Sequence, residues 1–135
     1  MLITTVTADR EMLFENPAHA REAIETLYRV QQLHPFFLYG FVIMPDHAHF
    51  LIFVPSPQTI SKIMNVYKMG VAFNTGLRGM WQRRFDARII KNKDTRTVLN
   101  YIHANPVKKG IVEKSEDYRW SSACGQWDVS QLHVQ

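Results

Sequence analysis

Two apolar segments lie next to each other in the chain with only two residues between them. The first, FFLYGFVIM at 36–44, is almost entirely apolar and bounded by prolines, as is typical of a central strand. Pro45-Asp46 turns the chain, and HAHFLIFV at 47–54 returns as a second apolar strand. The sequence therefore predicts a sheet with this antiparallel pair between two apolar layers.

Two histidines interrupt the second of these strands. His47 and His49 are separated by Ala48, and side chains alternate along a strand, so both imidazoles point to the same face. Such a pair is either two core histidines satisfied by neighbouring backbone groups or part of a metal site. We interpret the pair as metal ligands and keep the core reading as the alternative.

The remaining segments alternate between strand and helix patterns. Asn16-Pro17 is typical of a helix start, and that helix should end before Pro35. An apolar stripe from Ile60 to Val71 predicts a second helix. Asp94 or Thr95 can cap a last helix that stops close to Pro106, and strands are expected at 2–7 and 87–90. Tyr28, Tyr39 and Tyr67 fit apolar stripes and are expected to be structural.

This order of elements predicts an α+β fold, a ferredoxin-like sandwich with a largely antiparallel sheet and helices packed on it. The 135 residues suit one domain, 1–135, with a core of about 1–110 and an irregular tail at 111–135. We expect Tyr118 and Trp120 to anchor that tail.

Composition narrows the compartment and the class of protein. Cys124 is the single cysteine, which excludes an intramolecular disulfide and a multi-cysteine zinc site and suits a reducing cytoplasm. The N-terminal sequence does not resemble a secretory signal, and no apolar stretch approaches the roughly 20 residues of a membrane span. We therefore expect a cytoplasmic protein with no membrane partner.

Charge is distributed unevenly along the chain. Residues 1–61 carry three basic and six acidic residues, whereas residues 62–135 carry thirteen basic and six acidic ones. A basic half on a small domain favours a polyanionic partner such as nucleic acid, although an ordinary solvated surface gives the same count.

The predicted last helix adds oxygen donors. Tyr101 and Asn105 are four residues apart and share a helix face. Taken singly, Tyr101 fits a ring packed on the sheet and Asn105 a residue that bonds the last helix carbonyls. Together with His47 and His49, the Asn105 amide oxygen would form an open donor set that suits Mg²⁺ or Mn²⁺ better than closed tetrahedral zinc.

Four segments in this order resemble one known family. MPDHAHFLI, WQRRF, YIHANPVKKGIV and YRWSSA, spread over residues 36–123, are similar to segments of the single-tyrosine HUH transposases. The likeness is greatest to the REP-associated tyrosine transposase branch, relatives of the transposases of small bacterial insertion sequences. The chain departs from its relatives at Asp86, where they often carry a second aromatic residue.

The resemblance implies a ferredoxin-like fold with a catalytic tyrosine on a C-terminal helix laid across the sheet. Tyr101 matches the nucleophile, His47 and His49 match the metal-binding histidines, and Asn105 matches the third ligand. Such enzymes cleave and rejoin single-stranded DNA near hairpins through a 5′-phosphotyrosine. Insertion-sequence relatives are dimers that exchange the tyrosine helix, whereas a monomer is expected here.

We expect phosphate contacts from five basic residues, Lys62, Lys68, Arg83, Arg84 and Arg88. Tyr118 is a rival nucleophile that lacks a ligand-bearing residue one turn away, and His103 lies on a different helix face from Tyr101. Two other functions remain open at this point: a non-catalytic nucleic-acid-binding module of RRM-like topology, and a metal-dependent phosphohydrolase.

Overall fold

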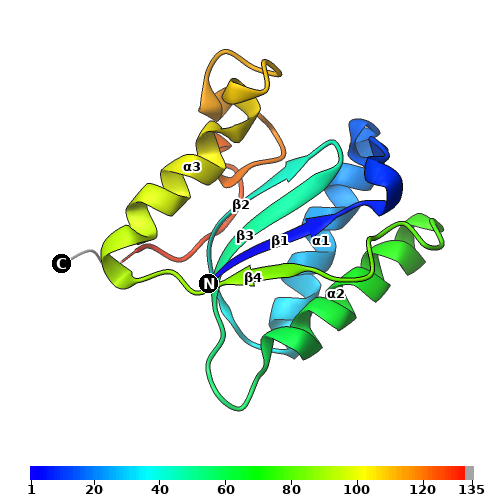
Figure 1. Ribbon diagram of the computed structural model, residues 1–135, viewed down its shortest axis with the longest axis horizontal. Helices are drawn as coiled ribbons and strands as arrows, with labels where there is room; N and C mark the ends of the chain where they lie inside the picture. Colours follow the sequence, from blue (N-terminus) through cyan, green and yellow to red (C-terminus); the bar gives the residue numbers. More distant parts are fainter. Residues whose placement is uncertain (133–135) are drawn as a thin grey trace.

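A four-stranded sheet with the order β2-β3-β1-β4 lies between helices on its two faces (Figure 1). The computed structural model describes residues 1–132. Its strands are β1 (Leu2–Val6), β2 (Phe37–Met44), β3 (His47–Phe53) and β4 (Asp86–Arg88). Its helices are α1 (Pro17–Leu33), α2 (Ile60–Thr75) and α3 (Thr95–Lys108), with short 3₁₀ turns at Ala8–Arg10, Leu13–Glu15, Asn92–Asp94, Ser115–Asp117 and Ser122–Cys124.

The connectivity is that of the ferredoxin-like sandwich expected from the sequence. Every strand pair is antiparallel: β2 and β3 form the hairpin, and β1 lies between β3 and β4. The elements β1, α1, β2, β3, α2 and β4 follow one another in the order of that fold, and α3 is added after them. The fold prediction is confirmed.

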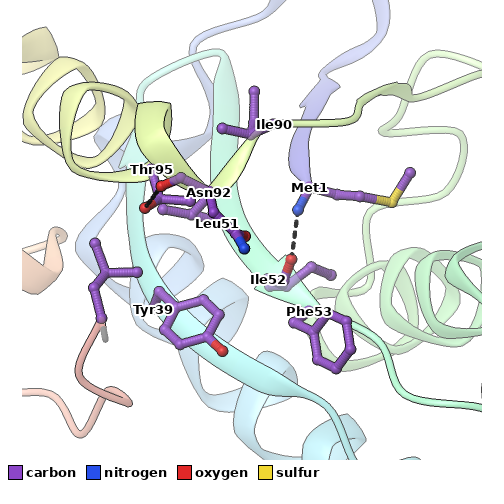
Figure 2. A pocket seen from close by; sticks show the side chains of 9 residues that line it. Met1, Tyr39, Leu51, Ile52, Phe53, Ile90, Asn92 and Thr95 are labelled. Atoms are coloured by element: carbon purple, nitrogen blue, oxygen red, sulfur yellow. Dashed lines mark hydrogen bonds between the residues drawn. The ribbon is translucent and has the colours of Figure 1, made fainter. Parts of the chain in front are cut away.

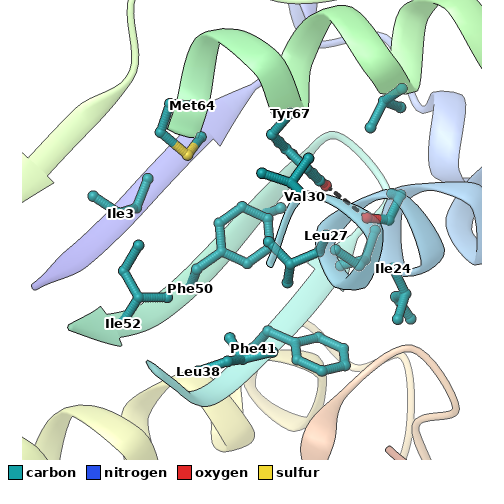
Figure 3. Close-up of a cluster of buried hydrophobic side chains, with 14 of the residues drawn as sticks. Ile3, Ile24, Leu27, Val30, Leu38, Phe41, Phe50, Ile52, Met64 and Tyr67 are labelled. Atoms are coloured by element: carbon teal, nitrogen blue, oxygen red, sulfur yellow. Dashed lines mark hydrogen bonds between the residues drawn. The ribbon is translucent and has the colours of Figure 1, made fainter. Parts of the chain in front are cut away.

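One face of the sheet packs against α1 and α2 (Figure 3). Ala48, Phe50 and Ile52 of β3 point into this layer because they alternate with the histidines. Tyr67 of α2 meets Phe50 edge-on at 5.2 Å between ring centroids, and its hydroxyl donates to the Ala23 carbonyl at 2.9 Å. This buried layer supports the sheet on the face opposite α3.

The other face carries α3, which packs on β2 and β3 through Leu99 and Ile102. Gly40 of β2 lies directly beneath the helix: a Cβ there would lie 2.2 Å from Leu99 Cδ1. Only a residue without a side chain lets α3 approach this closely.

The segment after α3 returns to the sheet and fastens the helix. The Tyr118 hydroxyl donates to the Ile43 carbonyl at 2.6 Å, and the Ile43 N–H donates to the Trp120 carbonyl at 2.8 Å. His103 Nε2 lies 2.7 Å from the Ser122 hydroxyl, which also receives the Phe41 N–H at 3.0 Å. Within the described part of the predicted tail, residues 111–132, Tyr118 and Trp120 anchor the chain to β2 as predicted; residues 133–135 lie outside the described residues.

Element boundaries follow the capping signals with small differences. The Asn16 side chain accepts the Ala18 N–H at 3.0 Å, as the cap predicted. The last helix continues to Lys108, past Pro106: the proline lacks the N–H that would bond to the Ile102 carbonyl, but the Lys109 N–H still donates to the Asn105 carbonyl at 3.1 Å. β4 is shorter than predicted, and Ile89 beyond it is exposed. Within residues 1–132 no helix has the length and apolar content that crossing a bilayer requires.

Candidate active site

The two histidines lie in the middle of the sheet on the face that carries α3. His49 is opposite Thr4 of β1 and Val42 of β2, while His47 is opposite Val6 and Met44. Their ring centroids are 4.8 Å apart, and His49 is only 8% exposed. The alternation of β3 therefore places both imidazoles together, as the spacing predicted.

Each histidine is held through its Nδ1 atom. Asp46 Oδ1 lies 2.6 Å from Nδ1 of His47, and Thr4 Oγ1 lies 2.8 Å from Nδ1 of His49. These contacts fix the ring orientations and leave the Nε2 atom of each ring for another partner. Histidine ligands of metal ions are commonly oriented in this way.

Asp46 is itself fixed by a neighbour. Arg10 donates to its other carboxylate oxygen at 3.0 Å, and Thr7 donates to its carbonyl through both N–H, at 2.9 Å, and hydroxyl, at 3.0 Å. Burial alone would raise the pKa of Asp46, but the hydrogen bonds from His47 and Arg10 lower it below its usual value. The carboxylate is therefore ionised at neutral pH, and its negative charge lies directly against the His47 ring.

His49 is neutral at physiological pH. Burial, with a smaller contribution from His47, lowers the pKa of His49 to about 4. A neutral imidazole is the form that coordinates a metal ion.

α3 brings two of its polar side chains, those of Asn105 and Tyr101, to this pair. The Asn105 side chain is buried with Nδ2 3.4 Å from His47 Nε2, and a half-turn of the amide would present its oxygen instead. The Tyr101 ring lies 6.0 Å from the His49 ring at 62°, and 46% of Tyr101 is exposed. Lys108 Nζ lies 5.1 Å from the centroid of the Tyr101 ring.

Two cavities open on either side of the histidines. One of about 390 Å³ lies between α3 and the sheet and is lined by His49, Tyr101 and Arg88, among others. The other, of about 370 Å³, is lined by His47, Arg10 and Lys109. An extended chain molecule can therefore reach the cluster from both directions.

The predicted basic residues are spread over the molecule. Arg88 reaches the cavity beside Tyr101, whereas Arg83 and Arg84 are exposed on the segment before β4. Lys62 and Lys68 lie on α2, the helix on the opposite face of the sheet. Lys68 Nζ donates to the Gln82 carbonyl at 2.7 Å, so it also holds the segment that carries the arginines.

The remaining tyrosines pack in or against the core, as expected. Tyr118 is buried and its hydroxyl is bonded to the backbone, so it has no access to a substrate. Tyr67 is in the core, and Tyr28 and Tyr39 are partly buried and pack against it, as predicted; Tyr39 also lines a cavity. A bulge between Leu38 and Gly40 interrupts the strand alternation at Tyr39.

Sequence reasoning missed several partners at the site. Thr4 and Arg10 are far from the histidines in sequence, and only strand pairing brings Thr4 to His49. Asp46, directly before His47, carried a signal because a carboxylate next to a ligating histidine is a common orienting partner. Asp86, the position where the chain departs from its relatives, lines the Tyr101 cavity.

Comparisons with known proteins all match this chain to transposases. Residues 2–105 match the family model described as "Transposase IS200 like". The chain is 32% identical over 98 residues to the REP-associated tyrosine transposase of Escherichia coli K12, covering 71% of this chain and 59% of that protein. A Haemophilus influenzae relative, provisionally assigned to the same class, is 34% identical over 105 residues, covering 66% of this chain and 60% of its own length.

The fold also matches a solved structure. A REP-associated tyrosine transposase bound to a REP hairpin superimposes with a TM-score of 0.80 and 25% identity, covering 98% of this chain and 88% of that chain. The chain spans about 60% of the length of the two curated relatives described above.

Proposed function

The chain belongs to the IS200-like transposase family, and we propose that it cleaves and rejoins single-stranded DNA with Tyr101 as the nucleophile. The main support for the proposal is that four side chains from β3 and α3 lie close together. His47 and His49 of β3 lie beside Asn105 and Tyr101 of α3, at the edge of a cavity open to solvent.

A divalent cation fits the residues at this site. His47, His49 and Asn105 would hold it, with two imidazole nitrogens and one amide oxygen as donors. Within residues 1–132 no cluster of three His, Cys, Asp or Glu residues offers a more complete set. A partly filled oxygen-and-imidazole set leaves room for water and phosphate, which suits Mg²⁺ or Mn²⁺. When bound, such an ion neutralises charge on a phosphate oxygen and orients it.

Tyr101 supplies the covalent step. The phenol loses its proton and its oxygen attacks the phosphorus of a phosphodiester in line with the 3′-oxygen. The new bond joins Tyr101 to the 5′-phosphate, the bond from phosphorus to the 3′-oxygen breaks, and the 3′-oxygen takes up a proton. One phosphodiester replaces another, so a later 3′-hydroxyl can reverse the step and join strands without ATP.

The charges around the cavity suit a nucleic acid. Arg88 and Lys108 flank Tyr101, while Arg10 and Lys109 lie by the second cavity. Arg83 and Arg84 extend this charge on the exposed segment before β4. We propose single-stranded DNA beside a hairpin as the substrate, because a structurally similar relative was solved with a REP hairpin.

We also propose that the protein acts as a monomer in the cytoplasm, where bacterial DNA lies. Tyr101 meets the histidines of its own chain, so one copy holds all four side chains.

A covalent adduct is the direct test. The protein is incubated with Mg²⁺ or Mn²⁺ and single-stranded oligonucleotides labelled at the 3′ end, with and without hairpins, and run on a denaturing gel. We expect a labelled band at the mass of protein plus DNA, and no such band for Tyr101→Phe or in EDTA. Tyr28→Phe serves as a control for the loss of a hydroxyl elsewhere, because Tyr28 lies on α1, on the opposite face of the sheet.

Other outcomes separate the alternatives. An adduct that persists in Tyr101→Phe would remove Tyr101 from the nucleophile role. Release of cleaved product without any adduct would indicate a phosphohydrolase, and binding without cleavage would indicate a non-catalytic module.

A further inference from the structure

Three aromatic side chains lie at the far end of the sheet face that carries the histidines. Phe37 and Phe53 pair across β2 and β3 with ring centroids 5.9 Å apart, and about half of each is exposed (47% and 53%). The Tyr39 ring stacks on Phe37 at 6.5 Å and 11°. This aromatic cluster, Phe37, Tyr39 and Phe53, places large apolar rings in water, which favours a role in binding.

A cavity of about 200 Å³ adjoins the aromatic cluster (Figure 2). Tyr39 and Phe53 line it from the sheet, Asn92 from the 3₁₀ turn before α3, and Thr95 from the first residue of α3. The Thr95 hydroxyl donates to the Asn92 carbonyl at 2.8 Å, so its oxygen remains free to accept. Aromatic rings combined with amide and hydroxyl groups suit a flat heteroaromatic ring with polar edges.

This cavity continues the one at the active site. Ile90 lines both cavities, and both run along the N-terminal half of α3. Thr95 precedes Tyr101 by six residues, which is about 9 Å along a helix. That distance corresponds to roughly two to three stacked nucleotides at 3.4 Å each.

The charge beside the cavity favours a polyanion over an apolar peptide. Lys91, Lys93 and Arg96 are exposed next to the lining residues Asn92 and Thr95, with Asp94 as the acidic residue among them. A strand that enters this cavity would therefore find cations for its phosphates and rings for its bases.

We propose that the cavity and the aromatic cluster receive an unpaired base of the single-stranded DNA, two to three nucleotides from the cleaved phosphate. The position relative to the cleaved phosphate depends on the proposed function, whereas stacking on the cluster can be tested without cleavage. The base stacks on the aromatic rings, and the Asn92 amide and Thr95 hydroxyl bond to its edge.

Photocrosslinking locates the base. Single-stranded oligonucleotides carrying 5-iodouracil at one position are irradiated with the protein in EDTA, so that the strand stays intact, and the linked peptides are identified by mass spectrometry. Binding is measured by fluorescence anisotropy for the double variant Phe37→Leu/Phe53→Leu. Phe73→Leu is the matched control, because Phe73 is 86% exposed on α2, on the opposite face.

We expect crosslinks at Tyr39 or Phe53 and at least fivefold weaker binding by the double variant, since stacking on an aromatic ring contributes strongly to each bound base. The control should bind as the wild type does. Crosslinks at the aromatic cluster without any covalent Tyr101 adduct would support the base site while the proposed function failed.

Two results would overturn the base site. One is an adduct at Tyr101 with no crosslink at the cluster and unchanged binding by the double variant, which leaves the proposed function intact. The other is a wild-type dimer in sedimentation that the double variant converts to a monomer, since a second copy of the chain would then cover the cluster.

Discussion

Leu99 of α3 lies directly over Gly40 of β2, so closely that a Cβ on the glycine would be 2.2 Å from Leu99 Cδ1. Tyr101 and Asn105 follow Leu99 on the same helix, so this contact sets their height above the histidines.

Gly40→Ala is expected to lift α3 from the sheet. We expect overpacking to cost about 1–3 kcal/mol in unfolding free energy and the Tyr101 adduct to form more slowly under conditions where the variant is fully folded. Urea unfolding and single-turnover cleavage measure the two effects.

Gly70→Ala is the control for that variant. A Cβ on Gly70 would lie 2.9 Å from Thr26 Cγ2, between α2 and α1 on the other face. Adduct formation at the wild-type rate is expected here. Equal rates for Gly40→Ala and the wild type would mean that this contact does not position Tyr101.

Asp46→Asn is expected to weaken metal binding. The substitution removes the negative charge 2.6 Å from His47 Nδ1 while keeping the size of the side chain. We expect Mn²⁺ affinity to fall roughly tenfold to a hundredfold, as measured by calorimetry. Asp94→Asn, an exposed position whose side chain does not cap α3, should leave the affinity unchanged.

Arg88→Ala is expected to weaken binding of single-stranded DNA. Arg88 lines the Tyr101 cavity, so its loss should lower the slope of log affinity against log salt concentration by about one. Arg29→Ala should leave the slope unchanged, because Arg29 lies on α1, on the opposite face of the sheet, and pairs with Glu22 and Glu25. Equal slopes for Arg88→Ala and the wild type would place the strand elsewhere.

Because Tyr118 is buried, we expect the protein to lose stability at high pH. Burial raises the pKa of Tyr118 to about 12, above its unfolded value near 10. Its contribution is therefore complete below pH 10 and is lost as the pH rises towards 12, by up to about 3 kcal/mol.

Tyr118→Phe separates this effect from those of the other tyrosines. At pH 8 the variant should be about 1 kcal/mol less stable, because the hydrogen bond to the Ile43 carbonyl is lost. Between pH 10 and 12 it should lose less stability than the wild type in urea unfolding. Parallel pH curves would show that Tyr118 does not titrate in this range.

Local patterns in the sequence were sufficient for the framework. The prolines around 36–44, the Asn16 cap and the alternation of His47 and His49 each depend on neighbours in the chain, and the structure agrees with them. Local patterns were not sufficient to predict the partners at the site, because the pairing of Thr4 with His49 joins residues far apart in sequence.

Tyr39 shows the limit of periodicity. It packs on the core as predicted, but periodicity did not indicate the bulge beside it or the cavity that it also lines. A bulge adds one residue to a strand without a distinctive sequence signal, so alternation fails from that point onwards. Lys68 makes a contact that the sequence pattern did not indicate, since its Nζ donates to the Gln82 carbonyl.

The attachment of α3 to the sheet has a consequence for a cleaved DNA end bound to Tyr101. The helix is joined to its own sheet through His103 and, beyond its end, through Tyr118 and Trp120. A DNA end attached to Tyr101 would consequently stay immobile relative to the histidines. Strand exchange would then depend on diffusion of a DNA strand with a free 3′-hydroxyl into the site, while α3 keeps its position.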